Sequence, residues 1–433
     1  MRAGGRLRGL VLSLAAAVAG LFLGLAPGVL ETGQLRPLDW LLPEGVVLAA
    51  LCLAAGRGAG VGRMALHWAL AALPPLLLCT LAATRLPWAE MLALAGLLAL
   101  MAGALHWARA RTRRTVAATM LLALAVLGGV QAAATMRSGS GGEAALARPP
   151  LGVMTALPLF RDRGAQAGLL DIGGRAPLLR ALPFTSAPLD RLDADSLKAF
   201  EDLLLAQPRL LRPEELVALD DWVRNGGRVV ILADPLLHWP DARPLGDPRR
   251  APLTSLLDPL LAHWGLVLEP AEAGRHAPVT RRVLAGGALL QLAGASAFAR
   301  SADGTCALEE EGFLARCRIG RGRALLVADA DWVDDRLWTL DPARPDDARA
   351  WTSDAVPLLA ALLRGETAAA RPARAWLVSQ EALISALRWA LALILLLALA
   401  LVRAVSNPSS THDPPRRHGR TDRKSDGPSQ DSG

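Results

Sequence analysis

Six apolar runs constrain this chain more than any other feature of its sequence. The first, from Leu10 to Leu30, contains no charged residue and is long enough to cross the ~30 Å hydrocarbon layer of a membrane as a helix. Arginines precede it and further runs follow it, so we interpret it as a retained anchor and not as a cleaved signal peptide. The other runs cover Leu41–Ala55, Met64–Ala83, Trp88–Trp107, Thr115–Ala134 and Ala382–Val402.

The composition agrees with a membrane protein. Hydrophobic residues make up 52% of the chain, which is more than an ordinary soluble protein contains. The net charge of +7 could indicate nucleic-acid binding, but the arginines gather at the ends of the apolar runs. We therefore predict the lipid bilayer, and no nucleic acid, as the partner of these basic residues.

The distribution of arginine predicts the orientation of the spans. Arg57 and Arg63 lie between the second and third runs, and four arginines lie between the fourth and fifth, at positions 109, 111, 113 and 114. A third basic group begins at Arg403, after the last run. Because cytoplasmic loops carry the excess of Lys and Arg, we expect both termini in the cytoplasm and residues 138–380 in the periplasm of a bacterial inner membrane.

This topology divides the chain into five parts. We expect N-terminal transmembrane helices over 1–137, a Ser/Gly/Pro linker over 138–150 and a periplasmic α/β domain over 151–375. A C-terminal transmembrane helix is expected over 382–403. The tail over 404–433 is rich in Ser, Pro, Asp and Arg and should be disordered in the cytoplasm.

The central region alternates between strand and helix patterns. Short apolar runs that resemble buried parallel strands alternate with segments of helical spacing, and a Gly-Gly pair stops the helix that begins at Pro213. This rhythm predicts an open, mostly parallel sheet. The expected strands are Gly152–Leu157, Leu203–Ala206, Val229–Leu232 and Arg323–Val327, and further helices are expected over Thr254–Trp264 and Ala355–Leu363.

The stretch Leu203–Pro235, LLLAQPRLLRPEELVALDDWVRNGGRVVILADP, resembles the auxiliary domain of gliding-type ABC transport systems and the related DUF4350-like domains. Leu325–Val333, LLVADADWV, is similar to a later strand of that family, which ends in an acid-rich turn. The resemblance implies a fold like that of class I glutamine amidotransferases and a role as a membrane accessory subunit. The chain departs from the family in its five N-terminal spans, where a single anchor is usual.

The motifs of common enzymes are missing from the sequence. Cys306 and Cys317 do not follow a strand that leads into a helix, as an amidotransferase nucleophile must, and His238, His263 and His276 have no obvious partner. The serines at 186, 196 and 255 lack a G-x-S-x-G setting. No Walker A motif and no H-E-x-x-H or C-x-x-C spacing occurs, so we predict no catalytic residue, cofactor or metal site.

The two cysteines of this region have a second interpretation. Glu311-Gly312 lies midway between Cys306 and Cys317, at the centre of an expected hairpin that places the cysteines opposite each other. An oxidising periplasm would permit a disulfide. A simple two-residue hairpin puts the pair at a hydrogen-bonded position, where Cα atoms are ~5.5 Å apart and disulfides are less common. A bulge at Gly312 would change that position, so a disulfide and two buried thiols both remain open.

Three aspartates mark a candidate edge for a ligand or partner. Asp234, Asp329 and Asp331 follow two of the expected parallel strands, and open α/β sheets bind ligands at the carboxyl ends of their strands. One interpretation is that they cap turns. The other is a pocket for a peptide, a glycan or a partner loop.

We therefore expect a non-catalytic inner-membrane accessory subunit of an ABC-type transport system. Because the chain has no P-loop, a separate ATPase and a multispan permease would be its partners. The alternatives are a periplasmic ligand sensor or scaffold without a transporter and, least supported, an amidotransferase-like enzyme.

Overall fold

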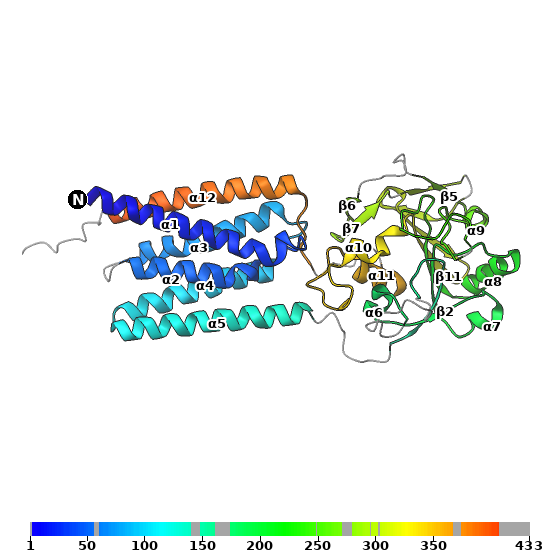
Figure 1. Ribbon diagram of the computed structural model, residues 1–433, viewed down its shortest axis with the longest axis horizontal. Coiled ribbons are helices and arrows are strands. Elements are labelled where there is room, and N and C mark those ends of the chain that lie inside the picture. Colours follow the sequence, from blue (N-terminus) through cyan, green and yellow to red (C-terminus); the bar gives the residue numbers. More distant parts are fainter. Residues whose placement is uncertain are drawn as a thin grey trace, which may run out of the picture.

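The structure is a computed structural model that describes residues 2–55, 60–139, 148–160, 174–247, 249–270, 279–294, 296–301, 304–366 and 374–406. A bundle of long helices lies at one side and an α/β domain lies at one end of that bundle (Figure 1). The chain enters the α/β domain after its fifth long helix and returns to the bundle for its last one.

Six helices are long and apolar enough to cross a membrane, and each corresponds to one of the six apolar runs. They are α1 (Arg2–Leu25) with η1 (Ala26–Leu30), η2 (Pro37–Trp40) with α2 (Leu41–Ala54), α3 (Val61–Ala82), α4 (Trp88–Arg109), α5 (Arg113–Gly139) and α12 (Gln380–Ser406). The last helix packs against α3 and α1, so the two parts of the predicted membrane region form one bundle.

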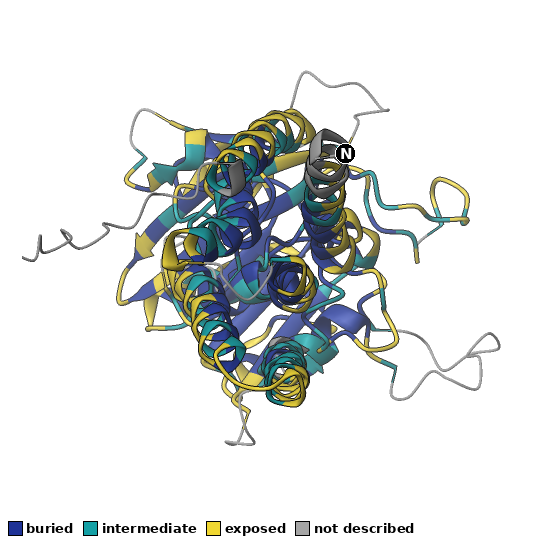
Figure 2. Ribbon diagram, turned by 90° about the vertical axis from the view of Figure 1, so that its left-hand side faces the viewer, coloured by how far each residue is buried: buried dark blue, intermediate teal, exposed yellow. Residues whose placement is uncertain are grey.

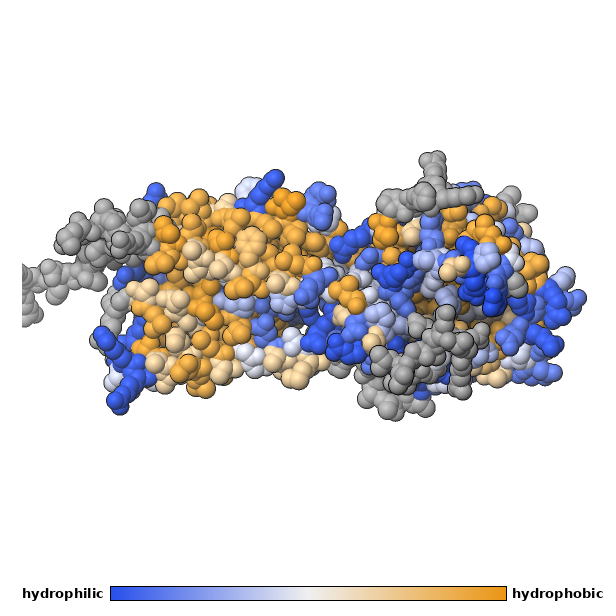
Figure 3. Space-filling view, viewed as in Figure 1, coloured by the Kyte–Doolittle hydropathy of each residue, from blue (hydrophilic) through white to orange (hydrophobic). Residues whose placement is uncertain are grey.

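The face of the bundle that Figure 3 shows is mostly apolar. Hydrophobic side chains cover most of it, whereas hydrophilic ones gather toward its two ends and over much of the α/β domain. In a view along the helices, buried residues lie toward the interior and exposed residues lie on the outside (Figure 2). This distribution is compatible with a multi-pass membrane protein, because lipid tails favour apolar contacts.

Helices α1 and α2 meet at a glycine. The indole of Trp40 packs against Gly24, where a Cβ atom would overlap the ring, and its Nε1 donates to the carbonyl oxygen of Leu21 at 2.9 Å. Small residues permit this close approach between membrane helices. Trp40 is fully buried as a result.

The α/β domain contains a seven-stranded sheet. Its order is β2-β1-β3-β4-β11-β10-β9; the first five strands are parallel to one another, and β10 pairs antiparallel with β11 on one side and with β9 on the other. The predicted open, mostly parallel sheet is therefore confirmed. The strands are β1 (Pro150–Thr155), β2 (Thr185–Pro188), β3 (Asp202–Ala206), β4 (Arg228–Leu232), β9 (Ala307–Glu309), β10 (Leu314–Ile319) and β11 (Gly322–Val327).

Each face of the sheet has its own core. In β3, Leu204 and Ala206 belong to one core, whereas Leu203 and Leu205 belong to the other, as the period of two in a strand requires. In Figure 1 the second face is covered by α7 (Ala194–Leu197), α8 (Pro213–Arg224) and α9 (Asp258–His263), which lie away from the bundle. The first is covered by α6 (Pro177–Ala181), α10 (Asp335–Trp338), α11 (Ala355–Leu363) and the hairpin of β6 (Val279–Val283) and β7 (Leu289–Ala293).

Some predicted boundaries were wrong. The first strand ends at Thr155 and not at Leu157, because the Thr155 hydroxyl accepts from the backbone N–H of Leu157 at 2.9 Å and turns the chain. The helix expected over Thr254–Trp264 is confined to α9, where Pro259 occupies the first turn. The expected linker begins later than predicted, since α5 continues to Gly139; residues 140–147 and 407–433 lie outside the described residues.

Candidate functional site

The structure brings Asp234, Asp329 and Asp331 together at the edge predicted from the sequence. Strands β4 and β11 are parallel neighbours, so their carboxyl ends lie side by side and the residues that follow them meet. One carboxylate oxygen from each aspartate lies within 4.8 Å of the others. All three residues are at most 2% exposed. We call them the carboxylate cluster.

Several oxygens of the cluster accept hydrogen bonds from backbone N–H groups. Asp234 accepts from Leu236 at 2.7 Å through Oδ1 and from Ala330 at 3.2 Å through Oδ2. Asp329 Oδ1 accepts from the N–H of Asp331 at 2.6 Å and of Trp332 at 3.3 Å. These bonds perform the turn-capping role that was the first interpretation of the aspartates.

Other polar atoms of the cluster have no such partner. Asp329 Oδ2 is buried without a hydrogen bond among the described residues. His238 donates its backbone N–H to Asp331 Oδ2 at 2.8 Å, and its ring Nδ1 lies 3.5 Å from the same oxygen. Neither ring nitrogen of His238 makes a hydrogen bond within the described part of the chain, although both are inaccessible to solvent.

Burial and mutual repulsion oppose full ionisation of the cluster. Burial, and then the negative charge of Asp234, raise the pKa of Asp331 to about 8. Burial raises the pKa of Asp329 well above its ordinary value, and the charges of Asp234 and Asp331 raise it further. Burial also raises the pKa of Asp234, against the lowering effect of the N–H groups of Leu236 and Ala330. The cluster thus favours bound protons or a bound cation.

Burial also limits what can contact these carboxylates. A peptide or glycan was one predicted ligand, but side chains at most 2% exposed offer no surface to a molecule of that size. A single ion is small enough to lie among them. The chemistry open to the cluster in this conformation is therefore proton or cation binding.

Gln207 supports the cluster from β3 and was not predicted. It follows the strand with a φ of 41°, and its buried side chain donates to Asp234 O at 2.9 Å and accepts from the Asp234 N–H at 2.9 Å. A left-handed conformation is uncommon for a residue other than glycine, Asn or Asp. The sequence signal was a polar residue directly after the apolar run LLLA.

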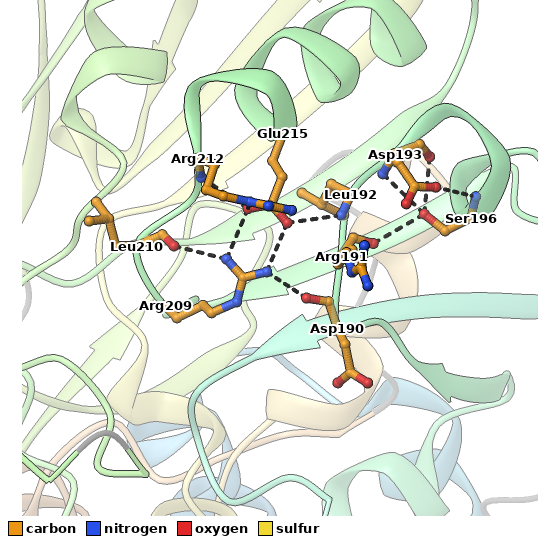
Figure 4. Close-up of polar contacts among 9 residues, drawn as sticks. All are labelled: Asp190, Arg191, Leu192, Asp193, Ser196, Arg209, Leu210, Arg212 and Glu215. Carbon is orange, nitrogen blue, oxygen red and sulfur yellow. Dashed lines mark hydrogen bonds and ion pairs between the residues drawn. The ribbon is translucent and has the colours of Figure 1, made fainter.

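The segment that resembles the transport-system family forms strand, helix and strand, and a polar network fixes its first turn. Glu215 of α8 accepts from both terminal nitrogens of Arg209, at 2.8 and 2.9 Å, and from the N–H groups of Arg212 and Leu192 (Figure 4). Arg209 also donates to the carbonyl oxygen of Asp190. The hydrogen bonds from Arg209 lower the pKa of Glu215 to about 2. The network holds the loop before α7 against the start of α8.

Cys306 and Cys317 form a disulfide between β9 and β10. The pairing Leu308↔Ala315 continues to place these two residues opposite each other, as the predicted hairpin does. Their Cα atoms are 4.3 Å apart, close to the ~4.5 Å of a non-hydrogen-bonded pair and shorter than the ~5.5 Å expected for a simple two-residue hairpin. The reason is the connection, where Glu310 to Gly312 form a 3-10 turn in place of a two-residue hairpin.

The remaining candidate nucleophiles and bases are dispersed. Ser196 caps α7 with Asp193, and Ser186 is buried without a hydrogen bond among the described residues. The His263 ring lies at the surface beside Arg224, with its Nε2 3.2 Å from the guanidinium. No serine and histidine side chains are hydrogen-bonded to each other in the described ranges; His276 lies outside them.

A second polar arrangement joins the α/β domain to the bundle, and we call it the junction. The segment before α12 forms antiparallel bridges on two sides, Gln34↔Trp376 and Ala83↔Leu377. Its backbone bonds include Thr84 N–H to Trp376 O at 2.7 Å and Leu377 N–H to Gly33 O at 2.8 Å.

Side chains extend the junction into the α/β domain. Gln34 Nε2 donates to the carbonyl oxygens of Ala348 and Trp351, at 2.9 and 2.7 Å. Trp351 in turn contacts the ring of Trp338 edge-on and lies under the guanidinium of Arg374 at 4.4 Å. These contacts connect the loop between α1 and α2 directly to the residues that precede α11.

Comparison with known proteins adds little to this geometry. No family model matches the chain, and no curated protein matches it. Solved structures with some likeness include an exo-β-1,4-mannosidase from Opitutaceae bacterium strain TAV5, at 14% identity and TM-score 0.26. The aligned region covers 49% of this chain and 37% of the mannosidase. A cytoplasmic protein from Salmonella typhimurium LT2 has 9% identity and TM-score 0.29 over 50% of this chain and 98% of that one.

A β-galactosidase from Rahnella sp. R3 is similar over 51% of this chain and 34% of its own length, at 15% identity and TM-score 0.26. This chain thus spans little more than a third of the mannosidase and of the galactosidase. At TM-scores this low, the likenesses establish neither a shared fold nor a shared activity.

Proposed function

We propose that the chain is a non-catalytic accessory subunit of an ABC-type transport system in a bacterial inner membrane, with a periplasmic binding domain. One observation carries the proposal: the segment from Asp329 to Asp354 begins at the carboxylate cluster and ends at the junction. A domain attached in this way can transmit a change at its sheet edge to the membrane helices. A domain on a flexible tether cannot transmit such a change.

The sequence resemblance supports the transport assignment. The stretch Leu203–Pro235 folds as β3, α8 and β4, in the order that the resemblance implies. The amidotransferase-like fold, the separate ATPase and the multispan permease are parts of the same proposal. The arginine-rich loops support a topology with both termini in the cytoplasm and residues 138–380 in the periplasm.

The state of the cysteines supports a non-catalytic role. The chain has four cysteines, and the two in the α/β domain are joined to each other. Cys52 and Cys79 are buried in α2 and α3. A thiolate is the nucleophile in amidotransfer, and a disulfide sulfur cannot act as one.

Purification of the full chain from its native membranes in mild detergent tests the transport assignment. We expect a subunit with a Walker A motif to copurify, identified by mass spectrometry, and the complex to hydrolyse ATP. The Gln34→Ala variant should change that ATPase rate, because it removes the hydrogen bonds of the Gln34 amide to Ala348 and Trp351. Recovery of the chain without any nucleotide-binding subunit would favour the alternative, a ligand sensor or scaffold.

Labelling of single introduced cysteines tests the topology independently. Lys198→Cys lies on an exposed side chain of the α/β domain and should react with a membrane-impermeant maleimide in spheroplasts. Ser425→Cys, in the tail, should react only after lysis. The reverse pattern would refute the proposed orientation.

A further inference from the structure

The carboxylate cluster concentrates three acidic groups that would repel one another if all were ionised. Three aspartates at most 2% exposed lie together, and none forms an ion pair with a Lys or Arg among the described residues. Buried charges are ordinarily paired or coordinate a metal. The imidazole of His238 lies beside the cluster, with its Nδ1 3.5 Å from Asp331 Oδ2.

Two groups at the cluster have no hydrogen-bond partner among the described residues. Asp329 is 1% exposed and its Oδ2 makes no hydrogen bond within the described residues, although the other oxygen accepts two. The ring of His238 comes from a different segment, and both of its nitrogens are inaccessible and without a hydrogen bond there. Buried oxygen and nitrogen atoms without a hydrogen-bond partner have lone pairs that a metal ion can use.

We propose that Asp234, Asp329 and Asp331 bind one divalent metal ion, with the imidazole of His238 as a fourth ligand. Carboxylates favour hard cations such as Mg²⁺, Ca²⁺ and Mn²⁺, and an imidazole among them favours Mn²⁺. Backbone hydrogen bonds to Asp234 and Asp331 leave a second lone pair on each oxygen for the ion. The ion would neutralise charge and connect the ends of β4 and β11.

The spacing of the carboxylates suits this ion after a small contraction. Ligands at about 2.1 Å from an octahedral ion are about 3 Å apart when adjacent and about 4.2 Å apart when opposite. The cluster oxygens lie within 4.8 Å of one another, so movements of less than about 1 Å complete the site. Rotation of the His238 ring, which no hydrogen bond holds among the described residues, can provide the fourth ligand.

Calorimetric titration of the full chain in detergent, after EDTA treatment and its removal, tests the proposal with MnCl₂ as the probe. We expect one Mn²⁺ per chain and a higher thermal midpoint in its presence. Asp329→Asn should abolish both effects. Asp354→Asn is the matched control, because Asp354 is equally buried but lies at the junction, and it should retain both.

The proposal is overturned if the wild-type chain binds no Mn²⁺, or if Asp329→Asn binds it as well as the wild type does. If Asp329→Asn fails to fold, His238→Gln replaces it: a loss of affinity of tenfold or more supports the site, and unchanged affinity overturns it. The site does not depend on the transport assignment, since the purified chain alone is the sample.

Discussion

Trp376 donates its indole N–H to Asp354 Oδ2 across 2.6 Å, and this hydrogen bond joins the segment that leads into α12 to the residue directly before α11. The same carboxylate oxygen accepts from the backbone N–H of Leu289 at 2.9 Å. Both side chains are at most 1% exposed. One aspartate therefore connects the bundle, a helix and the β6–β7 hairpin.

Loss of this bond should loosen the junction. Trp376→Phe keeps an aromatic ring but removes the donor, which leaves a buried carboxylate with fewer partners, so we expect a loss of about 1–3 kcal/mol in stability. The thermal midpoint of the detergent-solubilised chain measures it. Trp389→Phe, on an exposed side chain of α12, is the control and should change the midpoint little. Equal midpoints for the two variants would contradict the assigned role.

The stability of the junction should depend on pH through Asp354. Burial raises its pKa from 3.8 to about 6. The folded state therefore holds a proton more tightly than the unfolded state, so the stabilisation is complete below about pH 4 and is lost as the pH rises through 6. The difference corresponds to roughly 3 kcal/mol.

The Asp354→Asn variant isolates this effect, because an amide keeps an oxygen acceptor and does not titrate. We expect denaturant unfolding of the wild type to lose stability relative to this variant between pH 4 and pH 7. Parallel pH profiles would show that Asp354 does not titrate in this range.

The network in Figure 4 predicts the opposite pH dependence. Glu215→Gln replaces the carboxylate that accepts from Arg209, and we expect a loss of roughly 2–3 kcal/mol at neutral pH, since these are charge-assisted hydrogen bonds. Glu215 has a folded pKa of about 2, against 4.5 ordinarily, so the wild type should lose its advantage as the pH falls from about 4.5 toward 2. The exposed neighbour Glu214→Gln is the matched control in equilibrium unfolding. Similar losses for both would refute the network's importance.

The disulfide should stabilise the antiparallel edge of the sheet. It closes a loop with a sequence separation of 11, so replacement of both Cys306 and Cys317 by Ala should cost about 3 kcal/mol. Thermal unfolding with and without dithiothreitol measures it: the reductant should lower the midpoint of the wild type and leave the double variant unchanged. Non-reducing peptide mapping that recovers both thiols free would rule out the disulfide.

Much of the fold could be predicted from the sequence because its elements carry local signals. The six candidate spans follow from long apolar runs, and Ala355–Leu363 was predicted with the same limits that α11 has. Strand, helix and Gly-Gly signals around Pro213 likewise led to β3, α8 and β4. The ends of strands were harder to predict where a side chain, and not the neighbouring strand, accepts the hydrogen bond of a backbone N–H group. The Thr155 hydroxyl does this at the end of β1.

The candidate site, like the fold, could be predicted from the sequence only in part. The sequence by itself determined that Asp234, Asp329 and Asp331 follow parallel strands, and that Cys306 and Cys317 oppose each other, since strand periodicity and hairpin symmetry are local properties. Only the tertiary structure decided that the aspartates are buried together beside His238, and that Gln34, Trp376 and Asp354 join the bundle to the domain. Those contacts connect residues far apart in the chain, and their burial depends on how the elements pack, which no local pattern encodes.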